Sequence, residues 1–333
     1  MAIHIGRREF IATLAGATAW PLAPRAEQSD RMRRIAVLVG LAVSDPEGQK
    51  RFAAFRQGLS ELGWVDGKNL RTDYRWAFAD VDAMREFAKE LVELNPELIV
   101  ASSSSPAVAA LTKATATIPI IFVNIIEPVG RFVTSLAHPD GNVTGFTNFE
   151  YTMVQKWVEA LKEMAPHVKR VALLFNPDTA PYATNLVRPF EVVAASVAVE
   201  AEALAVRDST ELAAGIATLG RKLETALIVV PDIFNARHRE RIIALSLQYR
   251  MPTIYPYRFF AQEGGLMSYG VDVTDIHRRA AVYVDRILRG TKISDLPVQF
   301  PTRFELVINL KTARAIGIDV SPTLLARADE VIE

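Results

Sequence analysis

The feature that most constrains this chain is a regular alternation of short apolar runs with amphipathic segments, repeated in two successive series. In the first series, apolar runs at 35–39 and 98–101 predict buried strands. Residues at helical spacing over 48–62 and 81–94 predict helices, and Gly63 ends the first of them. Further strands are predicted at 70–76 and 119–123, and a helix is predicted to begin at Pro106.

The second series begins with a helix predicted over 154–164, which Pro166 ends. The stretch 94–100 and the stretch 223–229 occupy equivalent places in the two series, which indicates structural duplication and not a short tandem repeat. The other elements that we expect in this series are strands at 170–175, 199–206, 226–230, 253–255 and 266–269, and helices at 182–197, 209–223, 235–249 and 273–289.

Strand–helix alternation favours parallel sheets covered by helices on both faces. With 333 residues, two units are the natural expectation. We therefore predict an α/β chain of two doubly wound parallel-sheet lobes around a cleft. Lobe 1 comprises residues 33–147 plus 268–300, and lobe 2 comprises 148–267 plus 301–333. Ligands of open parallel sheets bind beyond the carboxyl ends of the strands.

The first 26 residues are typical of a bacterial export signal. Arg7 and Arg8 precede a short alanine-rich apolar stretch, and small residues follow near Ala26. The apolar run is about half of the roughly 20 residues that span a membrane, so we expect no membrane insertion. The adjacent arginines favour the twin-arginine type, with the general secretion route as the alternative. We expect a periplasmic protein whose signal is removed.

Composition excludes several classes of partner. The chain has 38 basic and 38 acidic residues, and removal of 1–26 takes away three arginines and one glutamate. The remaining 35 basic and 37 acidic residues give a net charge near −2, which argues against nucleic acid as a partner. The chain has no cysteine, so disulfides and a lipid-anchored mature form are excluded.

The strongest local site is the run Ser102-Ser103-Ser104-Ser105-Pro106, which follows a buried strand directly. Pro106 suits the start of a helix. Hydroxyls and free backbone N–H groups at the positive end of a helix favour a carboxylate or a similar anion. We therefore predict that Ser103, Ser104 and Ser105 contact the ligand. The alternative is plain N-capping by Ser105.

Polar side chains also follow other strands, where a cleft is expected. Asn124 and Glu127 follow the strand that ends at Val123, and Asp232 follows the strand 226–230. Asn176 follows the strand 170–175, and Ser44 lies in the loop after the first strand. An acidic group there could pair with a ligand amine, and asparagine could accept or donate hydrogen bonds. Asx-type turns beside prolines are the alternative role for these residues.

Aromatic residues gather in the loops of the second series. Tyr182, Phe234, Tyr257 and Tyr269 are ligand-binding candidates, and Tyr255 lies among them. Such side chains suit the sandwiching of a small planar or apolar ligand. Packing between the lobes is the alternative for each of them.

Catalytic motifs are absent from the sequence. It has no G-x-S-x-G elbow, no Walker-type loop and no G-x-G-x-x-G after the first strand. The five histidines are scattered without the spacing of metal ligands. We therefore expect no enzyme, no cofactor and no metal.

Four blocks, in order along 35–333, resemble one family of ABC importer substrate-binding proteins, the group with tryptophan-, tyrosine- and phenylalanine-binding members. The blocks are Phe55-Arg56-Gln57-Gly58-Leu59-Ser60-Glu61-Leu62-Gly63-Trp64, Gly141-Asn142-Val143-Thr144-Gly145, Gly264-Gly265-Leu266-Met267-Ser268-Tyr269-Gly270 and Phe304-Glu305-Leu306-Val307-Ile308-Asn309-Leu310-Lys311-Thr312-Ala313.

The resemblance implies a fold like the type I periplasmic binding proteins, with three hinge crossings near 146–150, 266–271 and 299–304. By position, Ser103–Ser105 resembles the family's carboxylate-holding loop. The loop 124–130, Asp232 and the segment 268–270 resemble further walls of the cleft. Glu127 stands where many relatives have aspartate.

We therefore expect an extracytoplasmic receptor, monomeric, that captures a small organic ligand by lobe closure and delivers it to a membrane permease. The expected ligand is an amino acid or an aromatic or branched carboxylate. A periplasmic sensor that presents its ligand to a receptor would use the same closure. An exported hydrolase or isomerase is the third reading, and it would turn its ligand over.

Overall fold

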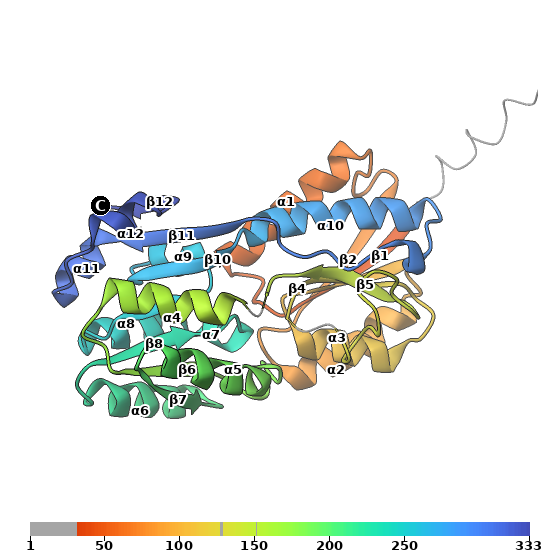
Figure 1. Cartoon of the computed structure of the whole chain (residues 1–333). Helices are drawn as coiled ribbons and strands as arrows, with labels where there is room; N and C mark the ends of the chain where they lie inside the picture. Colours follow the sequence, from red (N-terminus) through yellow and green to blue (C-terminus); the bar gives the residue numbers. More distant parts are fainter. Residues whose placement is uncertain (1–31, 127–128, 151) are drawn as a thin grey trace, which may run out of the picture.

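The chain forms two α/β lobes that lie side by side (Figure 1). The computed structural model describes residues 32–126, 129–150 and 152–333, so the predicted export signal and Glu127 lie outside the described residues. The first lobe is built from β1 (Arg33–Val39), α1 (Pro46–Glu61), β2 (Leu70–Trp76), α2 (Val81–Glu93), β3 (Leu98–Ser102), α3 (Ser105–Ala114), β4 (Ile120–Ile125) and β5 (Val143–Thr147).

The second lobe contains α4 (Thr152–Met164), β6 (Arg170–Phe175), α5 (Ala183–Ser196), β7 (Glu200–Ala205), α6 (Ser209–Gly220), β8 (Thr225–Val229), α7 (Ile233–Arg237), α8 (Arg239–Gln248), β9 (Thr253–Tyr255), α9 (Arg258–Gln262) and β10 (Met267–Val271). The chain then returns to the first lobe as α10 (Val273–Leu288) and the short 3-10 helix Ile293–Asp295. It ends in the second lobe with β11 (Phe304–Asn309), α11 (Leu310–Ile316), α12 (Pro322–Ala326) and β12 (Glu330–Ile332).

The first sheet has the order β2-β1-β3-β4-β5, and all of its neighbouring strands are parallel. Its strands β1, β3, β4 and β5 are almost wholly buried because helices cover both faces, whereas the edge strand β2 is polar and only partly buried (Figure 1). α1 and α10 pack together on one face, and α2 and α3 pack together on the other. The carboxyl ends of β1, β3 and β4 face the second lobe, since Leu41, Ser103 and Asn124 line one cavity together with residues of that lobe.

The second sheet has the order β12-β11-β10-β9-β8-β6-β7. The expectation of a purely parallel sheet is wrong at one pair, because β11 runs antiparallel to β10, with Tyr269 opposite Leu306. The reason is topological: the chain leaves β10 for α10 in the first lobe and re-enters the sheet from that side. β10 belongs to this sheet, so residues 268–271 lie in the second sheet, although the sequence analysis placed them in lobe 1.

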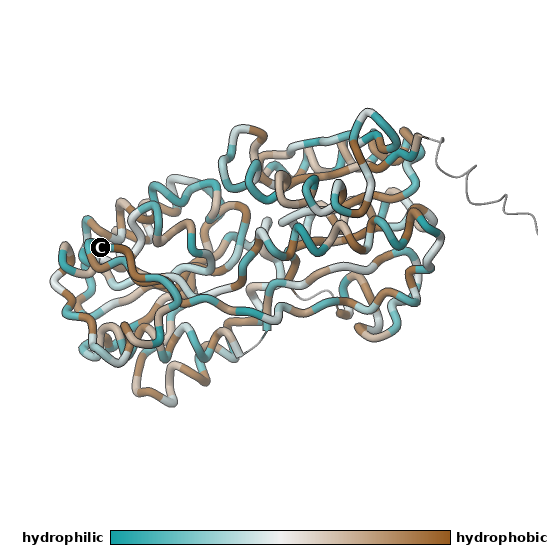
Figure 2. Tube along the Cα trace, turned by 90° about the horizontal axis from the view of Figure 1, so that it is seen from above, coloured by the Kyte–Doolittle hydropathy of each residue, from teal (hydrophilic) through white to brown (hydrophobic). Residues whose placement is uncertain are grey.

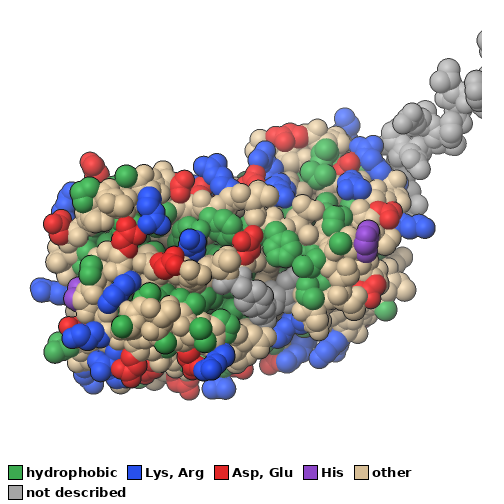
Figure 3. Space-filling model, viewed as in Figure 1, with side chains coloured by type: hydrophobic (Ala, Val, Ile, Leu, Met, Phe, Trp, Pro, Cys, Tyr) green, Lys and Arg blue, Asp and Glu red, His purple; other side chains and the backbone are tan. Residues whose placement is uncertain are grey.

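The predicted helix 235–249 is also divided. α7 ends at Arg237 and α8 begins at Arg239, with His238 between them at φ −101° and ψ 17°. Figure 2 shows the usual alternation of hydrophobic and hydrophilic residues along the helices. On the face drawn in Figure 3, basic and acidic side chains are interspersed.

The packing of α1 on α10 explains the glycine in the first family block. Gly58 lies on the buried face of α1. A Cβ added there would lie 2.8 Å from the carbonyl oxygen of Arg278 and 3.0 Å from the Cβ of Ala281. Glycine normally weakens a helix relative to alanine by about 1 kcal/mol. Here it allows the two helices to approach closely.

We predict that Gly58→Ala destabilises the protein, because the backbone of α10 cannot yield as a flexible side chain would. The free energy of unfolding should fall by about 1–3 kcal/mol in urea titrations. Ser60→Ala, on the exposed side of the same helix, is the control and should be neutral or slightly stabilising. Stabilisation by Gly58→Ala would show that the helices are less tightly packed than described.

Candidate functional site

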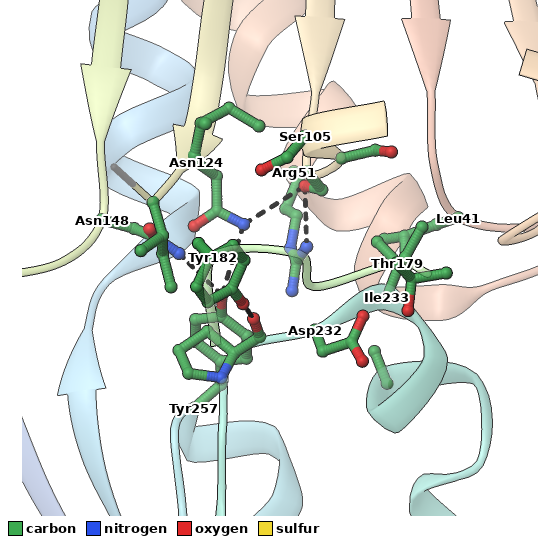
Figure 4. Close-up of a pocket in the computed structure, with 16 residues that line it drawn as sticks. Leu41, Arg51, Ser105, Asn124, Asn148, Thr179, Tyr182, Asp232, Ile233 and Tyr257 are labelled. Carbon is green, nitrogen blue, oxygen red and sulfur yellow. Dashed lines mark hydrogen bonds between the residues drawn. The ribbon is translucent and has the colours of Figure 1, made fainter. Parts of the chain in front are cut away.

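A cavity lies between the lobes at the carboxyl ends of the strands, where the topology places a ligand site (Figure 4). It contains about 390 Å³ of space free of protein atoms, its open mouth included. The first lobe contributes Leu41, Arg51, Ser103, Ser104, Ser105, Asn124 and Ile125, and the second contributes Thr179, Tyr182, Pro231, Asp232, Ile233, Ala236 and Tyr257. Ile126 and Asn148, which follow β4 and β5 at the junction of the lobes, complete the lining.

The serine loop lines this cavity through Ser103, Ser104 and Ser105, and its contact with a ligand carboxylate stays a prediction. Ser103 has a positive φ of 61°, a conformation that ordinary residues adopt rarely and that occurs often at functional sites. The N-cap of α3 is Ser104, whose hydroxyl accepts the N–H of Ala107 at 3.2 Å. The alternative of capping by Ser105 is therefore wrong by one residue. Ser105 is the first residue of the helix.

The most informative residue of the cavity is Arg51, which the sequence analysis did not single out. It is 2% exposed, and it stands on the buried face of α1 beside Phe52 and Phe55. One guanidinium nitrogen, Nη1, donates to the hydroxyl of Ser103 at 3.3 Å. Nε and Nη2 are buried and have no hydrogen-bond partner among the described residues. The sequence feature that could have identified Arg51 as buried is its position within an apolar stripe at helical spacing.

Burial lowers the pKa of Arg51, although the carboxylates of Glu47 and Asp45 act in the other direction. The guanidinium lies 5.6 Å from the ring centroid of Tyr257 and 5.7 Å from that of Phe259. Rings at this distance attract a cation but do not neutralise it. The first lobe therefore presents an uncompensated positive charge to the cavity.

The second lobe presents an acid, Asp232. It caps α7 by accepting the N–H of Phe234 at 3.1 Å, and it accepts the N–H of Asn176 at 3.2 Å. Burial raises the pKa of the Asp232 carboxyl to about 6, and these hydrogen bonds only partly oppose the rise. In Figure 4 its carboxyl group lies across the cavity from the serine loop.

Asn124, Asn148 and Tyr257 meet at the junction of the lobes. Asn148 donates to the Tyr257 hydroxyl at 2.8 Å, and Asn124 lies 3.5 Å from the same oxygen. Asn124 has a positive φ of 64°, at an irregularity in the pairing of β4 with β5. The side-chain oxygens of both asparagines are buried and have no hydrogen-bond partner among the described residues. Asn148 is a second residue that the sequence analysis did not include.

The remaining candidates divide between the cavity and other places. Tyr182 lines the cavity, and its hydroxyl donates to the carbonyl of Pro231. Asn176 makes the Asx-type turn that was its alternative, since its side-chain oxygen accepts the N–H of Asp178 at 2.8 Å. Phe234 packs against His238, with ring centroids 4.5 Å apart.

Two further candidates also lie away from the cavity. Ser44 is exposed in the loop after β1. Tyr269 stacks on Phe304, with ring centroids 5.9 Å apart. Neither residue belongs to the cavity lining described above.

The lobes touch at the rim of the cavity. The carboxylate of Asp45 in the first lobe lies 2.7 Å from Nη1 of Arg239 in the second, and both side chains are largely buried. Arg239 also pairs with Glu263 of its own lobe at 2.8 Å. Beside it, Arg237 donates to the carbonyl of Phe78 at 3.2 Å, and its guanidinium lies 3.9 Å from the Phe78 ring centroid.

Across the described ranges, no cluster of three or more histidine, aspartate or glutamate side chains could hold a metal ion. In the same part of the chain, none of the helices combines the length and the apolar character that crossing a membrane requires.

Residues 34–332 match the family model of the ABC transporter substrate-binding proteins. The chain belongs to this family. The resemblance drawn from the four sequence blocks is therefore confirmed.

Individual relatives agree with the family. A curated relative, the tyrosine-binding protein of Clostridioides difficile (strain R20291), is 25% identical over 293 residues, 88% of this chain and 84% of that protein. The solved ABC domain from Streptococcus pneumonia in complex with L-Trp is 26% identical and superposes with a TM-score of 0.83 over 90% of this chain and 100% of the other. A conserved domain protein from Vibrio cholerae gives 28% identity and a TM-score of 0.84 over the same shares. The expected two-lobed α/β fold is confirmed.

We predict that Asp232 makes stability fall as pH rises. Its pKa is about 6 in the folded state, above the ordinary value of 3.8. The folded state therefore gains stability at low pH, where the carboxyl is protonated. This gain is complete below about pH 4 and is lost as pH rises through about 6. The loss is on the order of 3 kcal/mol.

The measurement compares the ligand-free wild type with Asp232→Asn in urea at pH 4 and pH 7. Asparagine keeps the N-cap of α7 and cannot ionise. The wild type should lose stability relative to the variant between the two pH values. If the unfolding free energies of the wild type and the variant differed by the same amount at pH 4 and at pH 7, the pKa of the Asp232 carboxyl would lie near its ordinary value.

Proposed function

We propose that this protein captures a free amino acid between its lobes and delivers it to the permease of an ABC importer. The observation that carries the proposal is the pairing of opposite charges across one cavity. The unpaired guanidinium of Arg51 belongs to the first lobe, and the carboxyl of Asp232 belongs to the second. A zwitterion complements both walls at once.

The carboxylate end of the ligand is assigned to Arg51 and the start of α3. Nε and Nη2 of Arg51 are unused donors, and a carboxylate accepts such a pair with high strength and defined geometry. The beginning of α3 adds the partial positive charge of a helix N-terminus. A bound carboxylate also compensates a buried cation, and this gain is absent for a neutral ligand.

The ammonium end is assigned to Asp232. Its raised pKa reflects burial without a cation. A ligand ammonium placed beside it would favour the ionised form and lower that pKa. The free side-chain oxygens of Asn124 and Asn148 are further acceptors for the same group.

The side chain of the ligand is assigned to the apolar part of the lining. Leu41, Ile125, Ile126 and Ile233 surround the polar groups together with the rings of Tyr182 and Tyr257. Apolar and aromatic walls favour an aromatic or branched side chain. The tyrosine-binding relative and the L-Trp complex support an aromatic amino acid.

The family and the contact between the lobes support the proposed transport role. Because the two charged walls belong to different lobes, ligand binding favours the arrangement in which the lobes touch. Residues 146–150, 266–271 and 299–304 are the proposed hinges. We further propose that the protein is a monomer without catalytic activity or cofactor. Residues 1–26 direct its export to the periplasm, and the mature protein then presents its ligand to the permease.

We predict that Arg51→Met abolishes tight binding without unfolding the protein. Isothermal titration calorimetry with L-tyrosine, L-tryptophan, L-phenylalanine and L-leucine should detect at least one tight ligand of the wild type. The variant should bind that ligand about 100-fold more weakly or worse, because a buried charged hydrogen-bond partner is lost. Its ligand-free melting temperature should stay the same or rise, because an uncompensated buried charge is removed.

Lys50→Met is the matched control, since Lys50 is an exposed cation one residue earlier in the same helix. It should leave affinity unchanged. If none of the four amino acids binds to the wild type, the proposed ligand class is wrong. If one binds and Arg51→Met binds it equally well, the assigned carboxylate position is wrong.

We predict that Asp45→Asn speeds ligand release. The substitution keeps the side-chain oxygen that caps α1 by accepting the N–H groups of Glu47 and Gly48 at 2.9 and 3.0 Å. It removes the charge that pairs with Arg239 across the cavity rim. The dissociation rate in stopped-flow tryptophan fluorescence should rise roughly three- to tenfold.

Glu263→Gln is the control, because Glu263 pairs with the same Arg239 within the second lobe. It should change the dissociation rate much less than Asp45→Asn does. Equal effects of the two substitutions would mean that the contact between Asp45 and Arg239 does not stabilise the closed arrangement.

A further inference from the structure

A series of buried polar groups runs behind the serine loop and reaches the cavity lining at Ser103 and Arg51. It begins at His277 on α10 and continues through Ser102, the last residue of β3, to Ser103. Nε2 of His277 lies 2.8 Å from the Ser102 hydroxyl, which lies 3.2 Å from the Ser103 hydroxyl. The chain ends at Arg51, which donates to Ser103.

The positions of the protons in this chain follow from its two ends. Nδ1 of His277 lies 2.7 Å from the carbonyl oxygen of Val273. A carbonyl oxygen can only accept, so Nδ1 carries a proton. Burial and the nearby charge of Arg51 lower the pKa of His277 to about 3, so the ring is neutral near pH 7. Nε2 is therefore an acceptor, and the Ser102 hydroxyl donates to it.

The direction of the hydrogen bond between Ser102 and Ser103 follows from that between Ser102 and His277. Because the proton of Ser102 is committed to His277, Ser102 can only accept from Ser103. The Ser103 hydroxyl therefore donates to Ser102 and turns its lone pairs toward Arg51. Guanidinium is a donor only, and its contact with Ser103 has the matching direction. The Ser103 hydroxyl has no proton left for a ligand carboxylate.

We propose that His277 is a positioning residue for the ligand's carboxylate, acting through Ser102 and Ser103 to hold Arg51 with Nε and Nη2 free for the ligand. This inference rests on the proposed function. It changes the role predicted for Ser103, which supports the guanidinium and donates no hydrogen bond of its own to the carboxylate. The direct donors are Arg51 and the groups at the start of α3.

A purely packing role for His277 is the competing explanation. The ring meets Phe52 edge-on, with centroids 5.5 Å apart. A test must therefore separate the loss of a hydrogen-bond acceptor from the loss of a packed ring. Phenylalanine keeps the ring and removes the acceptor. Glutamine keeps an acceptor at the end of a side chain of similar reach.

The first test needs no ligand. Nitrogen-15 NMR of the ligand-free protein at pH 7, with labelled histidine, should show His277 as the neutral ring protonated at Nδ1. The His277→Phe spectrum assigns the signal by its absence. A ring protonated at Nε2, or a charged ring, would reverse the direction of the chain and overturn the proposal.

The second test is a double-mutant cycle on affinity for the amino acid that the wild type binds. His277→Phe and Ser102→Ala should each weaken binding roughly five- to tenfold. The double variant should be no weaker than either single variant, because each breaks the same chain. His277→Gln should recover most of the affinity. In the Arg51→Met background, His277→Phe should have no further effect.

Val284→Ala is the control for general damage to α10. Its side chain is fully buried in the core of the first lobe and is not part of the cavity lining, so its truncation should lower stability and not affinity. Additive losses for His277→Phe and Ser102→Ala, or an equal loss in the Arg51→Met background, would overturn the proposal. Failure of the wild type to bind any amino acid would instead overturn the proposed function, and the NMR result would stand by itself.

Discussion

The buried guanidinium of Arg51 is the constraint on which the rest of the site depends. A cation held away from water without an anion is costly, so the surrounding structure must hold it in place. The Ser103 hydroxyl, the rings of Tyr257 and Phe259, and the close packing of α1 on α10 do this. The cost of this arrangement is lowered when an anion enters the cavity.

Much of the fold could be predicted from periodicity, because strong apolar patterns coincide with the central strands and amphipathic helices. The strands 70–76, 170–175 and 253–255 agree with the structure to the residue. Periodicity did not reveal β5, β12 or α9. These elements are short, or glycine interrupts them, so neighbouring elements decide their structure. The antiparallel β11 could not be derived because its direction depends on the excursion of the chain through α10.

The site was predictable only where topology alone decides it. Ser103 and Asp232 follow strands and Asn124 is the last residue but one of β4, and the carboxyl ends of parallel strands meet at one edge. Arg51 is different, because arginine within a helix usually faces solvent and only its place in an apolar stripe distinguishes it. Asn176 was wrongly expected in the cavity: it follows a strand, but its side-chain oxygen accepts a hydrogen bond within its own turn. Proximity in sequence to a strand end therefore indicates a region and does not identify the contacts.

Asp45 ties a local element to the arrangement of the whole molecule. One carboxylate oxygen caps the helix that carries Arg51, and the other pairs with Arg239 of the opposite lobe. If the lobes separate, Oδ1 of Asp45 still caps α1, and its Oδ2 becomes exposed to water. Arg239 then pairs only with Glu263. The rim of an open molecule then carries a free carboxylate oxygen that a closed molecule lacks. If, as proposed, a bound ligand holds the lobes together, the charge exposed at this edge differs between the empty and the filled protein.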